Sequence, residues 1–155
     1  MVVIEDGIPI GQRFVSMGRT IGEGDFTLFH NLSWTIHPVH CDREYMRSSG
    51  ALGAERVLGA PCTLAIAAGL ALMSGVQRAF NAGGNRDVAW LGYEDVRFLA
   101  PVFPDDTLTL ESEVLSVRAT SKPQRRVARI KDVLRKQTGE VVMQCFRSHM
   151  FEKVA

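Results

Sequence analysis

The stretch PCTLAIAAGLALMSGVQ, residues 61–77, is the most apolar part of this 155-residue chain. It is shorter than the ~20 residues that a membrane-spanning helix needs, and it is rich in Ala and Gly. Pro61 suits the first turn of a helix, where its missing N–H costs nothing. Because the stretch has no charged residue before Arg78, the helix is apolar on all sides, and other structure should surround it. The stretch therefore predicts a buried helix of a soluble protein.

Long strands are predicted after this helix, in residues 88–102, 107–117, 127–136 and 139–151. In the second of them, Leu108, Leu110 and Val114 lie on one face, whereas Leu115 and Val117 fall on the other, which indicates a bulge or burial on both faces. A sheet must cover its apolar face, and the helix must be covered too. We therefore expect an α+β fold in which a curved antiparallel sheet wraps around the long central helix.

Composition narrows the function. A length of 155 residues favours a single domain, and a net charge of +1 gives no electrostatic case for binding nucleic acid or an anionic membrane. Three cysteines without a Cys-x-x-Cys pair favour free thiols in a reducing, cytoplasmic compartment. The N-terminus MVVIEDGIPI lacks the basic and apolar regions of a signal peptide.

Before the central helix, two histidines flank Pro38 in the segment SWTIHPVHCD, residues 33–42. A preceding helix, with Phe26, Phe29 and His30 on one face, should end before Pro38, because the residue preceding a proline avoids helical geometry. His37, His40 and Asp42 are only loosely compatible with metal binding, and we predict no metal site. Asp42 is better explained as the cap of a short helix that follows it.

Two segments resemble the MaoC-like branch of the hotdog-fold proteins, which includes the (R)-specific enoyl-CoA hydratases. Residues 20–45 resemble the family's helix, turn and Asn-Pro-x-His-x-Asp motif, and residues 96–114 resemble its Phe-x-x-Pro-Val-x-x-Gly-Asp strand. The resemblance implies a single hotdog domain over residues 1–155 and a homodimer or larger homo-oligomer. It also implies an acyl-CoA substrate in fatty acid metabolism, with no cofactor besides the coenzyme A of the substrate.

The resemblance assigns the catalytic residues one by one. His40 matches the family's catalytic histidine, which positions or deprotonates water. Thr35 stands where the family has its catalytic Asp, and a threonine hydroxyl cannot act as a carboxylate base. His37 replaces the family's Asn, either as a structural hydrogen-bonding residue or as a second acid–base group. The Asp-to-His spacing of Asp25 and His30 is interpreted as coincidence.

The start of the central helix should polarise the substrate thioester. Gly59, Ala60 and Cys62 are the predicted substrate-binding residues there, because a helix N-terminus offers free N–H groups and a positive dipole. In the basic turn SKPQRR, Arg125 and Arg126 are either solvated or contact the phosphates of coenzyme A.

The predicted function is therefore hydration or dehydration of an enoyl-CoA or 3-hydroxyacyl-CoA, including branched or dicarboxylic substrates of the mesaconyl type. The alternative is an acyl-thioester-binding protein without catalytic activity. A thioesterase is disfavoured, because residues 61–78 contain no carboxylate.

Overall fold

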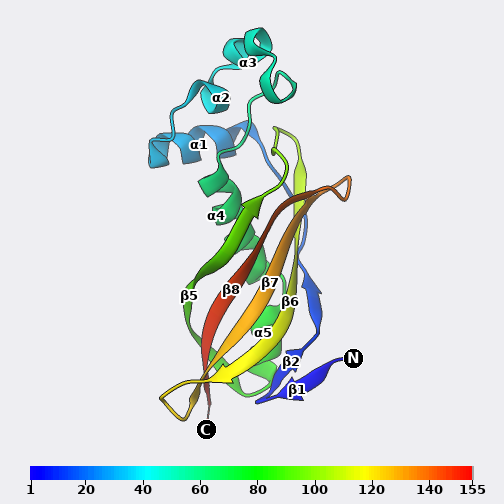
Figure 1. Cartoon of the computed structure of the whole chain (residues 1–155), viewed down its shortest axis with the longest axis vertical. Helices are drawn as coiled ribbons and strands as arrows, with labels where there is room; N and C mark the ends of the chain where they lie inside the picture. The colour runs from blue at the N-terminus through cyan, green and yellow to red at the C-terminus, as the bar shows by residue number, and fades with distance from the viewer. Residues whose placement is uncertain (155) are drawn as a thin grey trace.

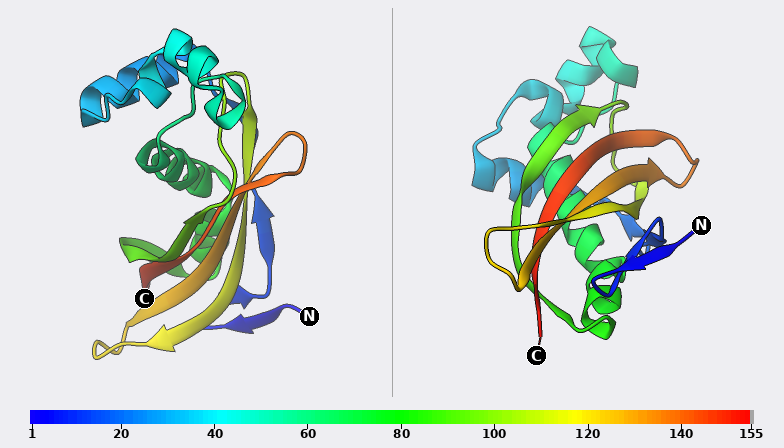
Figure 2. Two further views of the ribbon diagram at one scale, coloured as in Figure 1. Left: turned by 45° about the horizontal axis from the view of Figure 1, so that its top comes forward. Right: turned by 60° about the horizontal axis from the view of Figure 1, so that its bottom comes forward.

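The computed structural model describes residues 1–154, and Ala51 by its backbone alone. A curved sheet holds the central helix α4 (Ala60–Met73) on its concave side (Figures 1 and 2), as the sequence predicted. One side of α4 packs into the core with residues Cys62, Thr63, Ile66, Ala67, Leu70 and Ala71. The expected α+β architecture is thus confirmed.

Within residues 1–154 the main sheet has six strands in the order β3-β6-β7-β8-β5, with β4 also pairing with β6. All its pairs are antiparallel. Its strands are β3 (Arg13–Val15), β4 (Arg19–Thr20), β5 (Asn85–Phe98), β6 (Thr107–Ala119), β7 (Arg125–Lys136) and β8 (Val141–Lys153). A register shift between Val114 and Ser116 in β6 confirms the predicted bulge.

Four shorter helical segments complete the upper end of the molecule in Figure 1 and the turn into β5. They are α1 (Glu23–Ser33), α2 (Pro38–Cys41), α3 (Arg43–Ser49) and α5 (Val76–Ala82), with a 3-10 turn at Ala51–Gly53. The Asp42 side chain accepts from the Tyr45 N–H and caps α3, as predicted. β1 (Val3–Glu5) and β2 (Ile8–Ile10) form a small separate hairpin that sequence reasoning did not predict.

One predicted boundary was wrong. The helix predicted for residues 61–77 is interrupted at Ser74 and Gly75, where Gly75 adopts a φ of 99° and allows the chain to turn into α5.

The segment Ala60–Ala82 is long and apolar enough to cross a membrane, judged by length and composition alone. The core helix of a soluble protein has the same properties. Here α4 packs against the sheet with Leu108, Leu110, Leu134 and Met143 in one continuous core.

Polar groups also lie on the concave side of the sheet, below the apolar core. Asp132 accepts from Ser112 at 2.6 Å and from Arg147 Nε at 2.7 Å, and all three side chains are buried. His149, fully buried, lies two residues beyond Arg147, with its Nε2 3.2 Å from Asp87. Burial, reinforced by the charge of Arg147, lowers the pKa of His149 to about 4.

Candidate active site

His40 is held by a backbone hydrogen bond next to the start of the central helix. It lies on α2, and its Nδ1 is 2.7 Å from the carbonyl oxygen of Val57. A carbonyl can only accept, so Nδ1 carries the ring proton in the neutral imidazole. The lone pair is then on Nε2, which is the form that a general base requires.

A second imidazole, that of His30, packs against His40. The two rings are stacked, with their centroids 4.7 Å apart and their planes inclined by 14°. The Gly59 N–H donates to His30 Nε2 at 3.1 Å. A Cβ at position 59 would lie 2.9 Å from that nitrogen, so Gly59 is required there for space. His30 thus joins α1, α2 and the start of α4.

Sequence reasoning missed the contribution of His30. Its only signal was its position beside Phe26 on the predicted buried face of α1, and both residues are almost completely buried. Burial lowers the pKa of His30, and the nearby His40 and Arg56 lower it further, while the Phe26 carbonyl acts in the opposite direction. His30 is therefore neutral at pH 7, in agreement with its role as the acceptor of the Gly59 N–H.

An apolar pocket of about 380 Å³ lies on one side of His40. It is bounded by α4, by the end of β5 and by the segment before α4, and its lining residues are His40, Leu52, Val57, Leu58, Ala60, Thr63 and residues 98–102. Among the residues that the structure describes, no Asp or Glu lines this pocket. Helix geometry leaves the N–H groups of Ala60 and Cys62 without an intrahelical acceptor, and Ala60 lines the pocket. The pocket thus combines an imidazole with a helix N-terminus.

A smaller polar pocket of about 140 Å³ lies on the other side of His40. Its lining residues are Phe26, Thr27, His30, Asn31, His40, Cys41 and Arg56. His40 is the only described residue that lines both pockets. The imidazole of His40 therefore stands at the boundary between an apolar and a polar space.

Thr35 and His37 lie near His40 in the sequence, but neither lines the two pockets. The Thr35 hydroxyl is 2.7 Å from that of Ser33. His37 is exposed and caps α2, where its Nδ1 accepts from the Val39 N–H at 3.4 Å. The structure therefore brings His40 to the pockets and places the other two predicted catalytic residues outside them.

The predicted substrate-binding residues do not all lie at the apolar pocket. Ala60 lines the apolar pocket, but the N–H of Gly59 is already bound to His30. Arg125 and Arg126 begin β7 at the opposite end of the sheet (Figure 1), where they pair with Glu152 and Asp6. Nothing brings these two arginines to the pocket of the same chain, because antiparallel pairing fixes them beside the last residues of β8.

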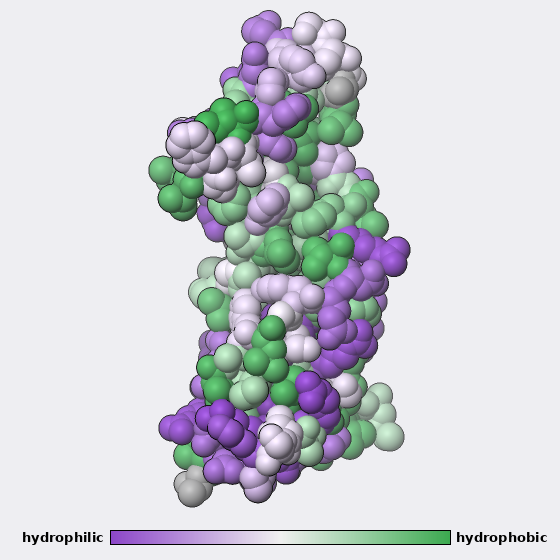
Figure 3. Space-filling model, turned by 60° about the vertical axis from the view of Figure 1, so that its left-hand side comes forward, coloured by the Kyte–Doolittle hydropathy of each residue, from purple (hydrophilic) through white to green (hydrophobic). Residues whose placement is uncertain are grey.

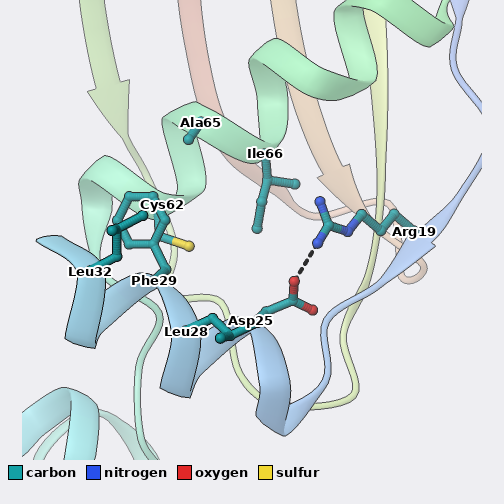
Figure 4. A pocket seen from close by; sticks show the side chains of 8 residues that line it. All are labelled: Arg19, Asp25, Leu28, Phe29, Leu32, Cys62, Ala65 and Ile66. Carbon is teal, nitrogen blue, oxygen red and sulfur yellow. Dashed lines mark hydrogen bonds and ion pairs between the residues drawn. The ribbon is translucent and has the colours of Figure 1, made fainter.

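Cys62 faces a different hollow, between α1 and α4 (Figure 4). This hollow has a volume of about 260 Å³ and contains the ion pair of Arg19 and Asp25. Burial raises the pKa of the Cys62 thiol to about 12, so this thiol is not a nucleophile at neutral pH. Within residues 1–154, no three His, Cys, Asp or Glu side chains cluster in a way that could hold a metal ion.

Comparison with known proteins gives matches over most of the chain. Residues 7–137 match the family model described as MaoC like domain. A mesaconyl-CoA hydratase from Cereibacter sphaeroides is 32% identical over 136 residues, which are 87% of this chain and 36% of that protein. The chain therefore spans about a third of the length of this curated relative.

Two solved structures show the same fold. The MaoC-like dehydratase from Rhodospirillum rubrum superposes with a TM-score of 0.81 at 23% identity, covering 99% of both chains. A conserved hypothetical protein from Mycobacterium tuberculosis with a double hotdog fold superposes with a TM-score of 0.77 at 21% identity, covering 98% of this chain and 46% of that one. The sheet around α4 is thus a hotdog fold.

Proposed function

This chain belongs to the MaoC-like domain family, and we propose that it adds water to, or removes water from, an acyl thioester of coenzyme A. The observation that carries the proposal is the position of His40. Its Nδ1 is bound to the Val57 carbonyl, its Nε2 is left as a base, and its ring borders a pocket at the start of α4. Family membership and the mesaconyl-CoA hydratase relative support the same class of reaction.

In the hydration direction, His40 Nε2 takes a proton from water as its oxygen attacks the β-carbon of the enoyl thioester. Negative charge then develops on the thioester oxygen. The N–H groups of Ala60 and Cys62 and the positive end of α4 are the groups that would stabilise it. The imidazolium of His40 returns the proton to the α-carbon, which leaves the ring ready for the next cycle.

Substrates of the mesaconyl type, which are branched and dicarboxylic, form the finer part of this proposal. Its support is the 32% identity to the mesaconyl-CoA hydratase together with the polar pocket next to His40. A long unbranched acyl chain would need only the apolar pocket. A polar substituent of the substrate could instead occupy the polar pocket, which borders the same imidazole.

One observation favours a second candidate, an acyl-thioester-binding protein without hydratase activity. The Thr35 hydroxyl faces Ser33, at the position where the sequence resemblance predicts the family's carboxylate, and no described Asp or Glu lines the apolar pocket. Such a protein would bind saturated and unsaturated acyl-CoA alike and would release both unchanged.

We further propose that two copies of the chain form the functional unit in the cytoplasm. Apolar side chains are exposed on or next to α1, α4 and β5, among them Leu32, Trp34, Leu72 and Leu91. Figure 3 shows apolar surface in several places on one face of the molecule. Leu32 is 84% and Trp34 83% exposed in the single chain. β5 is also an edge strand, so its outer backbone groups are available for pairing.

The decisive experiment compares His40→Ala with His37→Ala on crotonyl-CoA and mesaconyl-CoA, with hydration followed by the loss of enoyl-thioester absorbance. Loss of the base should lower kcat/KM about 100-fold or more, whereas His37→Ala should change it less than about threefold. Binding of butyryl-CoA, measured by calorimetry, should persist in both variants. A wild-type protein that binds acyl-CoA but hydrates neither substrate would support the binding protein instead.

A further inference from the structure

Arg56 is a buried cation at the border of the polar pocket. The residue is 8% exposed to solvent, and its Nη2 forms an ion pair with Glu23 of α1. Its guanidinium carbon lies 5.1 Å from the centre of the Phe26 ring, which holds the planar group in place. The Nε of Arg56 is buried and makes no hydrogen bond with a described residue, although Glu55 Oε1 lies 3.8 Å away as an ion-pair partner. A buried N–H donor without an acceptor is costly, and it indicates a place for an acceptor from outside the chain.

His30 brings a second donor to the same pocket. Because its Nε2 accepts from the Gly59 N–H, its ring proton is on Nδ1. The Nδ1 atom is buried and makes no hydrogen bond of ordinary geometry with a described residue, although the Phe26 carbonyl of the preceding helical turn acts on this ring. The polar pocket is therefore bordered by two buried side chains that each have an N–H without a hydrogen bond of ordinary geometry.

The rest of the lining is consistent with an anion. Thr27 and Asn31 add a hydroxyl and an amide, and no Asp or Glu among the described residues lines the pocket. Two carboxylates pair with Arg56, those of Glu23 and Glu55; their side chains are 57% and 39% exposed, and both are shared with Arg43. The pocket volume of about 140 Å³ equals that of about five water molecules at ~30 Å³ each, which is enough for a carboxylate group.

We propose that this polar pocket binds a second carboxylate of the substrate, attached to the carbon that is hydrated. Arg56 Nε and His30 Nδ1 donate to its two oxygens, with the thioester part in the apolar pocket. His40 borders both pockets, so a carboxylate directly bonded to the reacting carbon falls on the polar side while the thioester stays on the apolar side. This inference rests on the proposed function and names its substrate class as acyl thioesters with a β-carboxylate.

The test uses two saturated ligands, so that it does not depend on turnover. Methylsuccinyl-CoA carries a carboxylate on the β-carbon, and 2-methylbutyryl-CoA carries a methyl group there instead. Calorimetric titration of the wild type should show methylsuccinyl-CoA binding about 10- to 100-fold more tightly, since hydrogen bonds to charged groups are the strong ones. Arg56→Gln should remove this preference and leave the affinity for 2-methylbutyryl-CoA unchanged.

Three further variants keep the result interpretable. Arg43→Gln is the matched control, because Arg43 pairs with the same Glu23 but is exposed and borders neither pocket. It should keep the preference. Arg56→Lys should keep only part of it, because an ammonium lacks the fork of donors. Glu23→Gln should keep or increase the preference, because Arg56 remains and loses its competing carboxylate.

The outcomes separate the inference from the proposed function. Equal wild-type affinities for the two ligands, or an equal loss of both in Arg56→Gln with folding retained, would overturn the carboxylate site. Loss of free coenzyme A binding in Arg56→Gln would show that the pocket binds the phosphates of coenzyme A instead. That result would also overturn the carboxylate site. A preference that depends on Arg56, in a protein that hydrates no enoyl-CoA, would support the site and reject the hydratase.

Discussion

The rings of His30 and His40 are stacked with centroids 4.7 Å apart, although the two residues belong to different helices. His30 binds the Gly59 N–H, and His40 binds the Val57 carbonyl. Together they fix the start of the central helix against α1 and α2.

Replacing His30 by Ala should destabilise the protein by about 2–4 kcal/mol. The change opens a cavity beside His40 and leaves the buried Gly59 N–H without its acceptor. Urea unfolding at pH 7 measures the effect. Asn31→Ala, at an exposed neighbouring position on the same helix, serves as the control and should cost less than about 1 kcal/mol. Equal effects of the two changes would contradict a structural role for His30.

Adding a methyl group at Gly59 should disturb the same contact from the opposite side. The new Cβ would lie 2.9 Å from His30 Nε2, while the backbone φ of −60° is ordinary, so crowding alone causes the effect. We expect a loss of about 1–3 kcal/mol in thermal or urea unfolding. Gly24→Ala in α1 meets no atom within 4 Å and should instead stabilise the protein by about 0.5–1 kcal/mol. A neutral Gly59→Ala would show that the histidine ring can move aside freely.

Placing a carboxylate at position 35 with Thr35→Asp, where the sequence resemblance predicts one, should change kcat/KM for crotonyl-CoA by less than about tenfold. The side chain at position 35 faces Ser33 and borders neither pocket, so a carboxylate there is not positioned to act on water. Steady-state kinetics with the wild type as reference gives the answer. A gain of about 100-fold would show that the segment rearranges when substrate binds.

Acid should destabilise the protein partly through His149, whose pKa burial lowers to about 4. A histidine with a lowered folded-state pKa binds its proton more readily when unfolded. The neutral His149 therefore contributes fully to the free energy of unfolding above its unfolded-state pKa of 6.5. This contribution is lost as the pH falls toward 4. The shift corresponds to about 3 kcal/mol for this fully buried side chain.

Free energies of unfolding, measured with urea between pH 7.5 and 4.5, should thus decrease more steeply with falling pH in the wild type than in His149→Phe. Asp87, 3.2 Å away, has a pKa raised by burial and acts in the opposite direction, so Asp87→Asn should make the acid loss steeper. Identical slopes in the wild type and His149→Phe would reject this explanation of the acid sensitivity.

Thiol reagents should modify only Cys41 in the folded protein. Cys41 is exposed, whereas Cys62 and Cys145 are buried and burial raises the pKa of both thiols to about 12. Mass spectrometry after N-ethylmaleimide treatment should find one adduct, none in Cys41→Ser, and three after unfolding in urea. Rapid labelling of Cys62 without denaturant would mean that α1 opens away from α4.

Local signals predicted several elements correctly because each depends on neighbours in the chain. Asp42 caps α3, the break in alternation after Val114 marks a bulge, and Pro61 lies in the first turn of α4. His40 could be selected because Pro38 and Asp42 accompany it in a short motif. By contrast, His30 and Arg56 come from separate segments, and no short pattern joins either of them to His40.

The apolar stretch 61–77 and the alternating strands after it predicted a curved sheet around a central helix, because such segments can bury their apolar surface in few ways. Two motifs in the right order indicated the family and, through it, the hotdog fold. Neither signal indicated which side chains border the same pocket as His40. The folded chain brings His30 of α1 and Arg56 of the segment before α4 to that imidazole. It leaves Thr35, His37, Arg125 and Arg126 elsewhere. The physical reason is that the contacts of His40 depend on how α1, α2 and the start of α4 pack together, which local propensity does not specify.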